Sequence, residues 1–247
     1  MNICLNDLIE IALKLTPELG RFREVGKMKT PILILNLKGY DEVLGEQALK
    51  YARIANKIAE KYQTVQILVA PHLPTFKQIA EVTSCIAQHI DSLEPGPYTG
   101  HIVPKEIKLL GGIGSLINHS EKRMPLEDIR KSIELCRKYG LVSFVCAQDN
   151  NEVRTIAKLN PDFIAIEPPE LIGSDASVSK ARPESITQAV IDLKNSNTQL
   201  LCGAGINTRK DVEKAIQLGA KGILVASAVV MADDVEGTLE ELVKGMV

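Results

Sequence analysis

The chain has 247 residues, of which 45% are hydrophobic and 24% are charged. These proportions are typical of a globular protein with a large hydrophobic core. The formal net charge of −2 argues against nucleic-acid binding, because no basic surplus is present to neutralise phosphates. No apolar run approaches the roughly 18 residues of a membrane span, so we expect no membrane partner. The five cysteines are scattered without a CxxC pair, which predicts a reduced, cytoplasmic protein.

Residues 1–27 do not match the rest of the chain. Met1–Leu15 has the apolar spacing of an amphipathic helix, which Pro17 and Gly20 interrupt. The segment lacks the basic start and the cleavage site of a secretory signal. We expect either an upstream start or a short extra helix on the outside, and we favour the first. A single folded domain is predicted over residues 28–247.

From Pro31 onward, short apolar runs alternate eight times with amphipathic stretches. The expected strands are Ile32–Leu37, Val65–Ala70, Ser84–Gln88, Gly114–Asn118, Val142–Cys146, Asp162–Ile166, Gln199–Cys202 and Gly222–Val225. Expected helices include Glu46–Tyr62, Leu126–Lys138 and Asp211–Leu218. This alternation predicts right-handed βαβ units and a parallel sheet. Eight units in about 220 residues fit a closed (β/α)8 barrel better than an open sheet.

An acidic residue, Glu167, follows four apolar or small residues and precedes Pro168 and Pro169. The pattern predicts a buried parallel strand that cannot continue past the prolines. A carboxylate held at the apolar mouth of a barrel is placed to act as a general base. Taken alone, the same pattern also describes an ordinary polar strand end.

The first expected strand ends in Asn36-Leu37-Lys38. Because residues two apart share a face of a strand, we expect Asn36 and Lys38 both to point toward the barrel axis. A lysine in that position is costly unless it meets an anion. A lone lysine at a strand end more often reaches out to solvent.

The fourth expected strand leads into Asn118-His119-Ser120-Glu121. By the same spacing, His119 and Glu121 are expected to share a face, where Glu121 could pair with Lys38. That pairing would leave His119 free to hydrogen-bond a substrate oxygen. A lone histidine after a strand is more often structural.

Small residues follow the last two expected strands, in Cys202–Ile206 and Val225–Val230. They let backbone N–H groups approach an anion, and barrels commonly bind phosphate at this place. The Gly-Ala-Gly sequence alone would suit any tight turn. The two turns together therefore predict a phosphate site.

Three segments, Asn36–Lys38, Asn118–Glu121 and Glu167–Gly173, resemble the signatures of the triosephosphate isomerase family. Four further segments resemble its archaeal form, namely Ala87–Asp91, Pro95–His101, Val178–Ala181 and Cys202–Ile206. The resemblance covers Pro31–Val247 in order, and residues 1–27 fall outside it.

The resemblance implies the interconversion of dihydroxyacetone phosphate and D-glyceraldehyde 3-phosphate through an enediolate, in glycolysis and gluconeogenesis. This family is itself the standard illustration of a glutamate base paired with a neutral histidine and a closing loop. By the resemblance, Glu167 is the base and His119 polarises the carbonyl. Lys38 supplies positive charge, Asn36 orients the site and Glu121 fixes Lys38.

The resemblance also implies a closing lid over Pro168–Ser179, with Ile172 at its tip. Implied substrate contacts are Asn36, Leu37, Lys38, Ile172, Gly173, Gly205, Ala226 and Ser227. Ser174-Asp175 departs from the usual lid tip, and we expect Asp175 to point away from phosphate. The family implies no metal or organic cofactor and a homo-oligomer, with a tetramer favoured over a dimer.

Two other classes of protein remain open on the residues alone. One is another phosphate-binding barrel, such as an isomerase or aldolase of amino-acid biosynthesis. It would not need Asn36, Lys38, His119 and Glu167 together. The other is a non-catalytic barrel or scaffold, which would typically lack the base or the ammonium.

Overall fold

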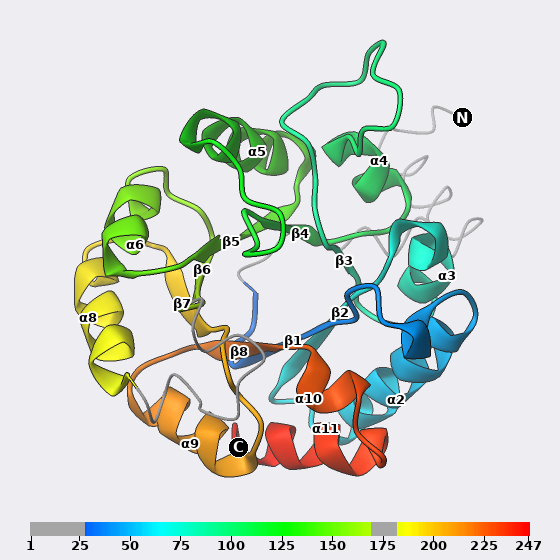
Figure 1. Ribbon diagram of the computed structural model, residues 1–247, viewed down its shortest axis with the longest axis vertical. Helices are drawn as coiled ribbons and strands as arrows, with labels where there is room; N and C mark the ends of the chain where they lie inside the picture. Colours follow the sequence, from blue (N-terminus) through cyan, green and yellow to red (C-terminus); the bar gives the residue numbers. More distant parts are fainter. Residues whose placement is uncertain (1–27, 169–181) are drawn as a thin grey trace, which may run out of the picture.

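The computed structural model describes residues 28–168 and 182–247, and the described chain alternates strands with helices. The strands are β1 (Ile32–Asn36), β2 (Gln66–Ala70), β3 (Ile86–Ala87), β4 (Gly114–Ile117), β5 (Val142–Ala147), β6 (Phe163–Ile166), β7 (Gln199–Cys202) and β8 (Gly222–Val225). They form a central ring, with helices around its outside (Figure 1). The prediction of eight strands in a barrel is confirmed.

The outer layer consists of helices that connect successive strands and of two helices that follow β8. The α-helices are α2 (Gln47–Lys61), α3 (Phe76–Ala80), α4 (Pro104–Leu109), α5 (Leu126–Tyr139), α6 (Asn150–Ala157), α8 (Pro183–Leu193), α9 (Arg209–Gln217), α10 (Ser227–Val230) and α11 (Val235–Lys244). Two short 3-10 helices, η2 (Asp41–Val43) and η3 (Leu73–Thr75), follow β1 and β2. No helix in the described part of the chain is both long and apolar enough to cross a membrane.

All strand pairs are parallel, in the order β2-β1-β8-β7-β6-β5-β4-β3. A single parallel bridge between Val69 and Cys85 joins β2 to the chain just before β3. The ring is therefore nearly closed, and its thinnest seam lies between β2 and β3. Here the structure differs from the expected strand Ser84–Gln88, because only Ile86 and Ala87 pair along the ladder with β4.

Helix ends follow local capping chemistry. The C-terminal end of α5 is Gly140, whose φ of 62° is the left-handed conformation that glycine adopts readily. The side chain of Thr208 accepts a hydrogen bond from the backbone N–H of Asp211, and the Asp211 carboxylate accepts one from the backbone N–H of Thr208. This capping box starts α9 two residues before the expected Asp211.

The core has two layers because successive strand side chains face opposite sides. Inside the barrel, Phe144 stacks on Phe163 with ring centroids 5.0 Å apart. Between strands and helices, buried side chains such as Leu33, Leu35 and Val145 form the larger cluster. The inner layer fills the barrel beneath the strand ends, so those ends form the floor of any site above them.

Phe144→Ala should lower the free energy of unfolding by about 3–5 kcal/mol, because it removes a fully buried ring from the inner layer. Denaturant unfolding measures this loss. Leu109→Ala is the matched control, since Leu109 is 68% exposed and its change should stay within about 0.5 kcal/mol. Equal effects of the two substitutions would contradict the assignment of Phe144 to the core.

Candidate active site

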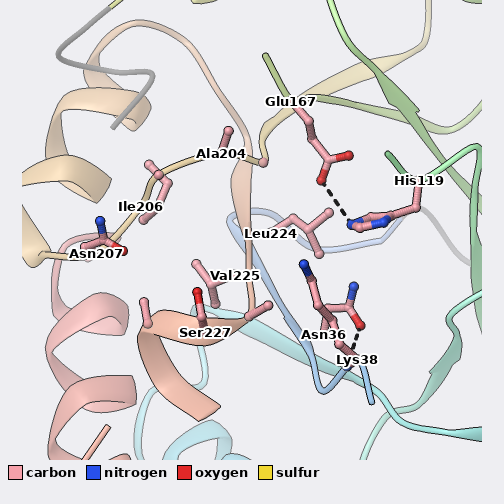
Figure 2. A pocket seen from close by; sticks show the side chains of 14 residues that line it. Asn36, Lys38, His119, Glu167, Ala204, Ile206, Asn207, Leu224, Val225 and Ser227 are labelled. Atoms are coloured by element: carbon pink, nitrogen blue, oxygen red, sulfur yellow. Dashed lines mark hydrogen bonds and ion pairs between the residues drawn. The ribbon is translucent and has the colours of Figure 1, made fainter. Parts of the chain in front are cut away.

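One pocket gathers residues from the carboxyl ends of β1, β4, β6, β7 and β8 (Figure 2). Seven of the residues predicted from the sequence line it, namely Asn36, Lys38, His119, Glu167, Gly205, Ala226 and Ser227. Glu167 and His119 lie on one side of the pocket, and Ile206, Asn207 and Ser227 lie on the other (Figure 2). Segments far apart in the chain therefore meet because parallel strands end at the same face of the barrel.

Glu167 directly follows β6 and is almost completely buried, at 3% exposure. Its backbone N–H donates to the Ala147 carbonyl at 2.8 Å, which fixes the strand exit against β5. Burial raises the pKa of Glu167 to about 7, although the Cys146 thiol and the Lys38 ammonium act in the opposite direction. The carboxyl group is therefore balanced between its acid and base forms near neutral pH.

Gly203 makes room for this carboxyl group. A Cβ atom at Gly203 would lie 2.6 Å from Cγ of Glu167 and 3.0 Å from its Oε1. Any side chain there would displace Glu167, so the glycine has a packing role in addition to permitting a turn. The sequence indicated Gly203 only as part of a phosphate turn.

His119 lies beside Glu167, with its Nε2 3.7 Å from Glu167 Oε1. The backbone N–H of Glu121 donates to Nδ1 of His119 at 3.2 Å, so Nδ1 carries no proton. In the neutral ring the proton is then on Nε2, which faces the pocket. Burial, followed by the positive charge of Lys38, lowers the pKa of His119 and keeps the ring neutral. A neutral imidazole here can donate a hydrogen bond to a substrate oxygen.

Lys38 is fixed at both its backbone and its ammonium. Its Nζ lies 2.7 Å from Glu121 Oε1, and the lysine side chain is 15% exposed. Its backbone N–H donates to Asn36 Oδ1 at 3.0 Å, and its carbonyl accepts from Gln88 Nε2 at 3.0 Å. The predicted pairing of Lys38 with Glu121 is thus present. The hydrogen bond from Gln88 to the Lys38 backbone was not predicted. The only signal for it in the sequence is a polar residue after β3.

Asn36 and Lys38 both line the pocket, but strand alternation, from which this was predicted, is not the cause. β1 ends at Asn36, and Lys38 has a left-handed φ of 49°, so the two side chains do not follow strand alternation. Likewise β4 ends at Ile117 and Asn118 has a φ of 61°. Left-handed residues at the two exits turn the chain back over the pocket, which the spacing of residues could not predict.

Asn118 holds the turn that carries His119. Its Nδ2 donates to the Cys146 carbonyl at 2.9 Å, and its Oδ1 accepts the Met124 N–H at 2.9 Å. Short polar side chains of this kind tolerate the left-handed conformation because they bond to nearby backbone. The turn that carries His119 is therefore tied to the end of β5.

Four predicted residues remain, and the two that the structure describes, Leu37 and Glu121, do not line the pocket. The Leu37 side chain is fully buried in the core layer between strands and helices, so its position does not support substrate contact. Ile172 and Gly173 lie outside the described residues, as does the lid after Pro168. Glu121 is 58% exposed and reaches the site through Lys38. Within residues 28–168 and 182–247, no group of three or more His, Cys, Asp or Glu is placed to hold a metal ion.

A parallel barrel whose mouth holds a buried carboxyl group, a neutral imidazole and an ammonium is typical of an isomerase that acts on a small substrate. A family model described as "Triosephosphate isomerase" matches residues 31–245. The chain belongs to the triosephosphate isomerase family, and its activity is the isomerisation of triose phosphate.

Curated relatives carry the same description. The triosephosphate isomerase of Methanocaldococcus jannaschii is 45% identical over 217 residues, covering 86% of this chain and 99% of the relative. That of Methanothermus fervidus is 44% identical over 223 residues, covering 89% and 100%. That of Sulfolobus acidocaldarius is 42% identical over 223 residues, covering 89% and 96%. The resemblance to the archaeal form is thus confirmed, and the two other classes are excluded.

Glu167→Gln should raise the stability of the protein at neutral pH. The folded pKa of about 7 lies above the ordinary value of 4.5, so folding favours the protonated carboxyl group. The contribution of the protonated Glu167 carboxyl group to the free energy of unfolding is fully present below pH 4.5. It is lost as the pH rises to about 7. The glutamine variant does not titrate, so the difference in free energy of unfolding between Glu167→Gln and the wild type should shift by about 3 kcal/mol in favour of the variant from pH 4.5 to pH 7.

Urea unfolding across this pH range measures the difference. Glu106→Gln on α4 is the control, because that side chain is exposed to water and its curve should follow the wild type. A constant difference between Glu167→Gln and wild type from pH 4 to 8 would show that the Glu167 carboxyl group is not destabilised by burial.

Proposed function

We propose that Glu167 is the base that moves the proton between the two carbons of the triose phosphate. Its carboxylate takes a proton from the carbon next to the carbonyl, and the electron pair of the broken C–H bond forms the carbon–carbon double bond of an enediolate. The protonated Glu167 then returns the proton to the neighbouring carbon. The single observation that supports this is the buried carboxyl group 3.7 Å from His119 Nε2 in the pocket that also contains Lys38.

His119 and Lys38 are proposed to stabilise the negative charge that develops on oxygen. The Nε2–H of neutral His119 donates to the carbonyl oxygen and then moves protons between the two oxygens. The Lys38 ammonium adds positive charge, Glu121 fixes the ammonium and Asn36 orients the Lys38 backbone. Preorganised donors in a water-poor site typically contribute a few kcal/mol each to such a transition state.

The phosphate is proposed to bind on the opposite side of the pocket. Backbone N–H groups of Gly205, Ala226 and Ser227 are the proposed donors, and all three residues line the pocket. Gly205 has a φ of 64°, which suits a turn that brings N–H groups close to an anion. Contacts from Ile172 and Gly173 in the lid stay predictions.

We also propose a cytoplasmic role in glycolysis and gluconeogenesis. The described cysteines, Cys85, Cys136, Cys146 and Cys202, are free and buried, as is common in a reducing compartment. Fractionation that places the enzyme outside the cytoplasm would contradict this.

Lys38→Met tests the assignment of the ammonium. The substitution keeps the length of the side chain but removes its charge, so kcat/KM should fall by about 10³-fold or more. A coupled assay of glyceraldehyde 3-phosphate isomerisation measures the loss. Lys57→Met is the matched control, because Lys57 is 69% exposed on α2 and should leave kcat/KM unchanged. Near-wild-type turnover in Lys38→Met would remove Lys38 from the mechanism.

We propose that residues 28–247 form one catalytic domain that assembles as a homo-oligomer, with a tetramer favoured over a dimer. Leu44, Leu73 and Tyr98 are at least 40% exposed and follow the adjacent strands β1, β2 and β3. Sedimentation of the full chain and of a chain that begins at Met28 should give the same oligomer with equal activity. A fully active monomer would contradict the oligomer, and an inactive shorter chain would contradict the domain boundary.

A further inference from the structure

The helix α10 has only four residues, Ser227–Val230, and two of the proposed phosphate donors, Ala226 and Ser227, lie at its start. A helix this short does not hold its own position, because helix formation becomes favourable only over longer segments. Ala226 and Ser227 at its start line the pocket, and Val229 and Val230 at its end are buried. The position of the donors therefore depends on what holds the buried end of α10.

The buried end of α10 is held by a residue from α2. The Tyr51 hydroxyl donates to the Val230 carbonyl at 2.9 Å, across 179 positions of sequence. Tyr51 is 5% exposed, so water does not readily replace this hydrogen bond. The carbonyl at the end of a helix has no intrahelical partner, and Tyr51 supplies one.

A second hydrogen bond carries the restraint to the pocket. The N–H of Val230 donates to the Ala226 carbonyl at 3.0 Å, so Val230 contacts Tyr51 through one backbone group and Ala226 through the other. Ala226 directly precedes Ser227, and the N–H groups of both are the proposed phosphate donors. A shift of the Val230 carbonyl would therefore move those donors.

The helix α2 is itself fixed to the C-terminal helix α11. Lys61 pairs with Glu240 at 2.7 Å, and the Tyr62 hydroxyl donates to the same carboxylate at 2.7 Å. In Figure 1, α10 lies beside β8, close to both α2 and α11. Burial and the negative charge of Glu42 raise the pKa of Tyr51, so its hydroxyl remains a donor throughout the neutral pH range.

We propose that Tyr51 is a positioning residue for phosphate binding, which acts by holding the Val230 carbonyl and thereby the N–H groups at the start of α10. The inference rests on the proposed phosphate contacts of Ala226 and Ser227. Tyr51 does not line the pocket, and its proposed effect is confined to the side of the pocket where Ala226 and Ser227 lie.

Tyr51→Phe tests this, because it removes one hydroxyl and keeps the buried ring. KM for glyceraldehyde 3-phosphate and the inhibition constant of inorganic phosphate should each rise by about three- to tenfold, as expected for one lost hydrogen bond. The kcat/KM for D-glyceraldehyde, which has no phosphate, should stay at the wild-type value. A general loss of structure would lower turnover of both substrates alike.

Tyr139→Phe is the matched control, since it removes a tyrosine hydroxyl that contacts Glu94 and neither α2 nor α10. It should leave the phosphate inhibition constant unchanged. An unchanged constant in Tyr51→Phe, or an equal loss of activity toward D-glyceraldehyde, would overturn the role of Tyr51.

Ser227→Asp separates this inference from the proposed phosphate site. Aspartate suits the first turn of a helix but places a negative charge beside the phosphate, so phosphate affinity should fall by at least about tenfold. Wild-type phosphate affinity in Ser227→Asp would overturn the phosphate site and the inference with it. If phosphate affinity is weakened in Ser227→Asp but stays at the wild-type value in Tyr51→Phe, the phosphate site stands and only the role of Tyr51 is overturned.

Discussion

The site depends on keeping a carboxyl group out of water without giving it a full set of partners. Glu167 is 3% exposed, and burial is the main reason that its pKa rises to about 7. The apolar strand β6 delivers it, the Ala147 carbonyl fixes its backbone, and Gly203 leaves the space for its side chain. A solvated carboxylate would be a much weaker base, so the role proposed for Glu167 requires a buried carboxyl group, although its burial opposes folding at neutral pH.

The same exclusion of water sets the state of His119. Desolvation disfavours the charged form of any group, so it raises the pKa of an acid and lowers that of an imidazole. One environment thus gives a proton acceptor and a neutral hydrogen-bond donor 3.7 Å apart. Lys38 supports both, because its charge favours ionised Glu167 and disfavours a charged His119 ring.

Much of the fold could be predicted from local pattern, since β7 and β8 have the expected bounds and α5 ends one residue from its predicted end. The short β3 could not, because strand length there depends on which backbone groups pair across the seam. The sequence predicted that Lys38 and His119 lie in the pocket, but it did not predict the backbone conformation that brings them there. Left-handed backbone at Lys38 and Asn118 is stabilised by partners such as Gln88 and Cys146, which are distant in sequence.

Hydrogen bonds to these distant partners hold the loops above the barrel in fixed positions relative to the strands. The exit of β1 is tied to the chain after β3 through Gln88, and the exit of β4 to β5 through Asn118. The exit of β7 is tied to β6, because the Gly203 N–H donates to the Ile166 carbonyl at 3.0 Å. Each exit is therefore fixed against another strand or its exit and not only by its own sequence. Gln88 Nε2 also donates to the Ala70 carbonyl of β2 at 3.0 Å, across the seam where β2 has a single bridge to the chain before β3. This side-chain amide compensates there for the missing strand pairing.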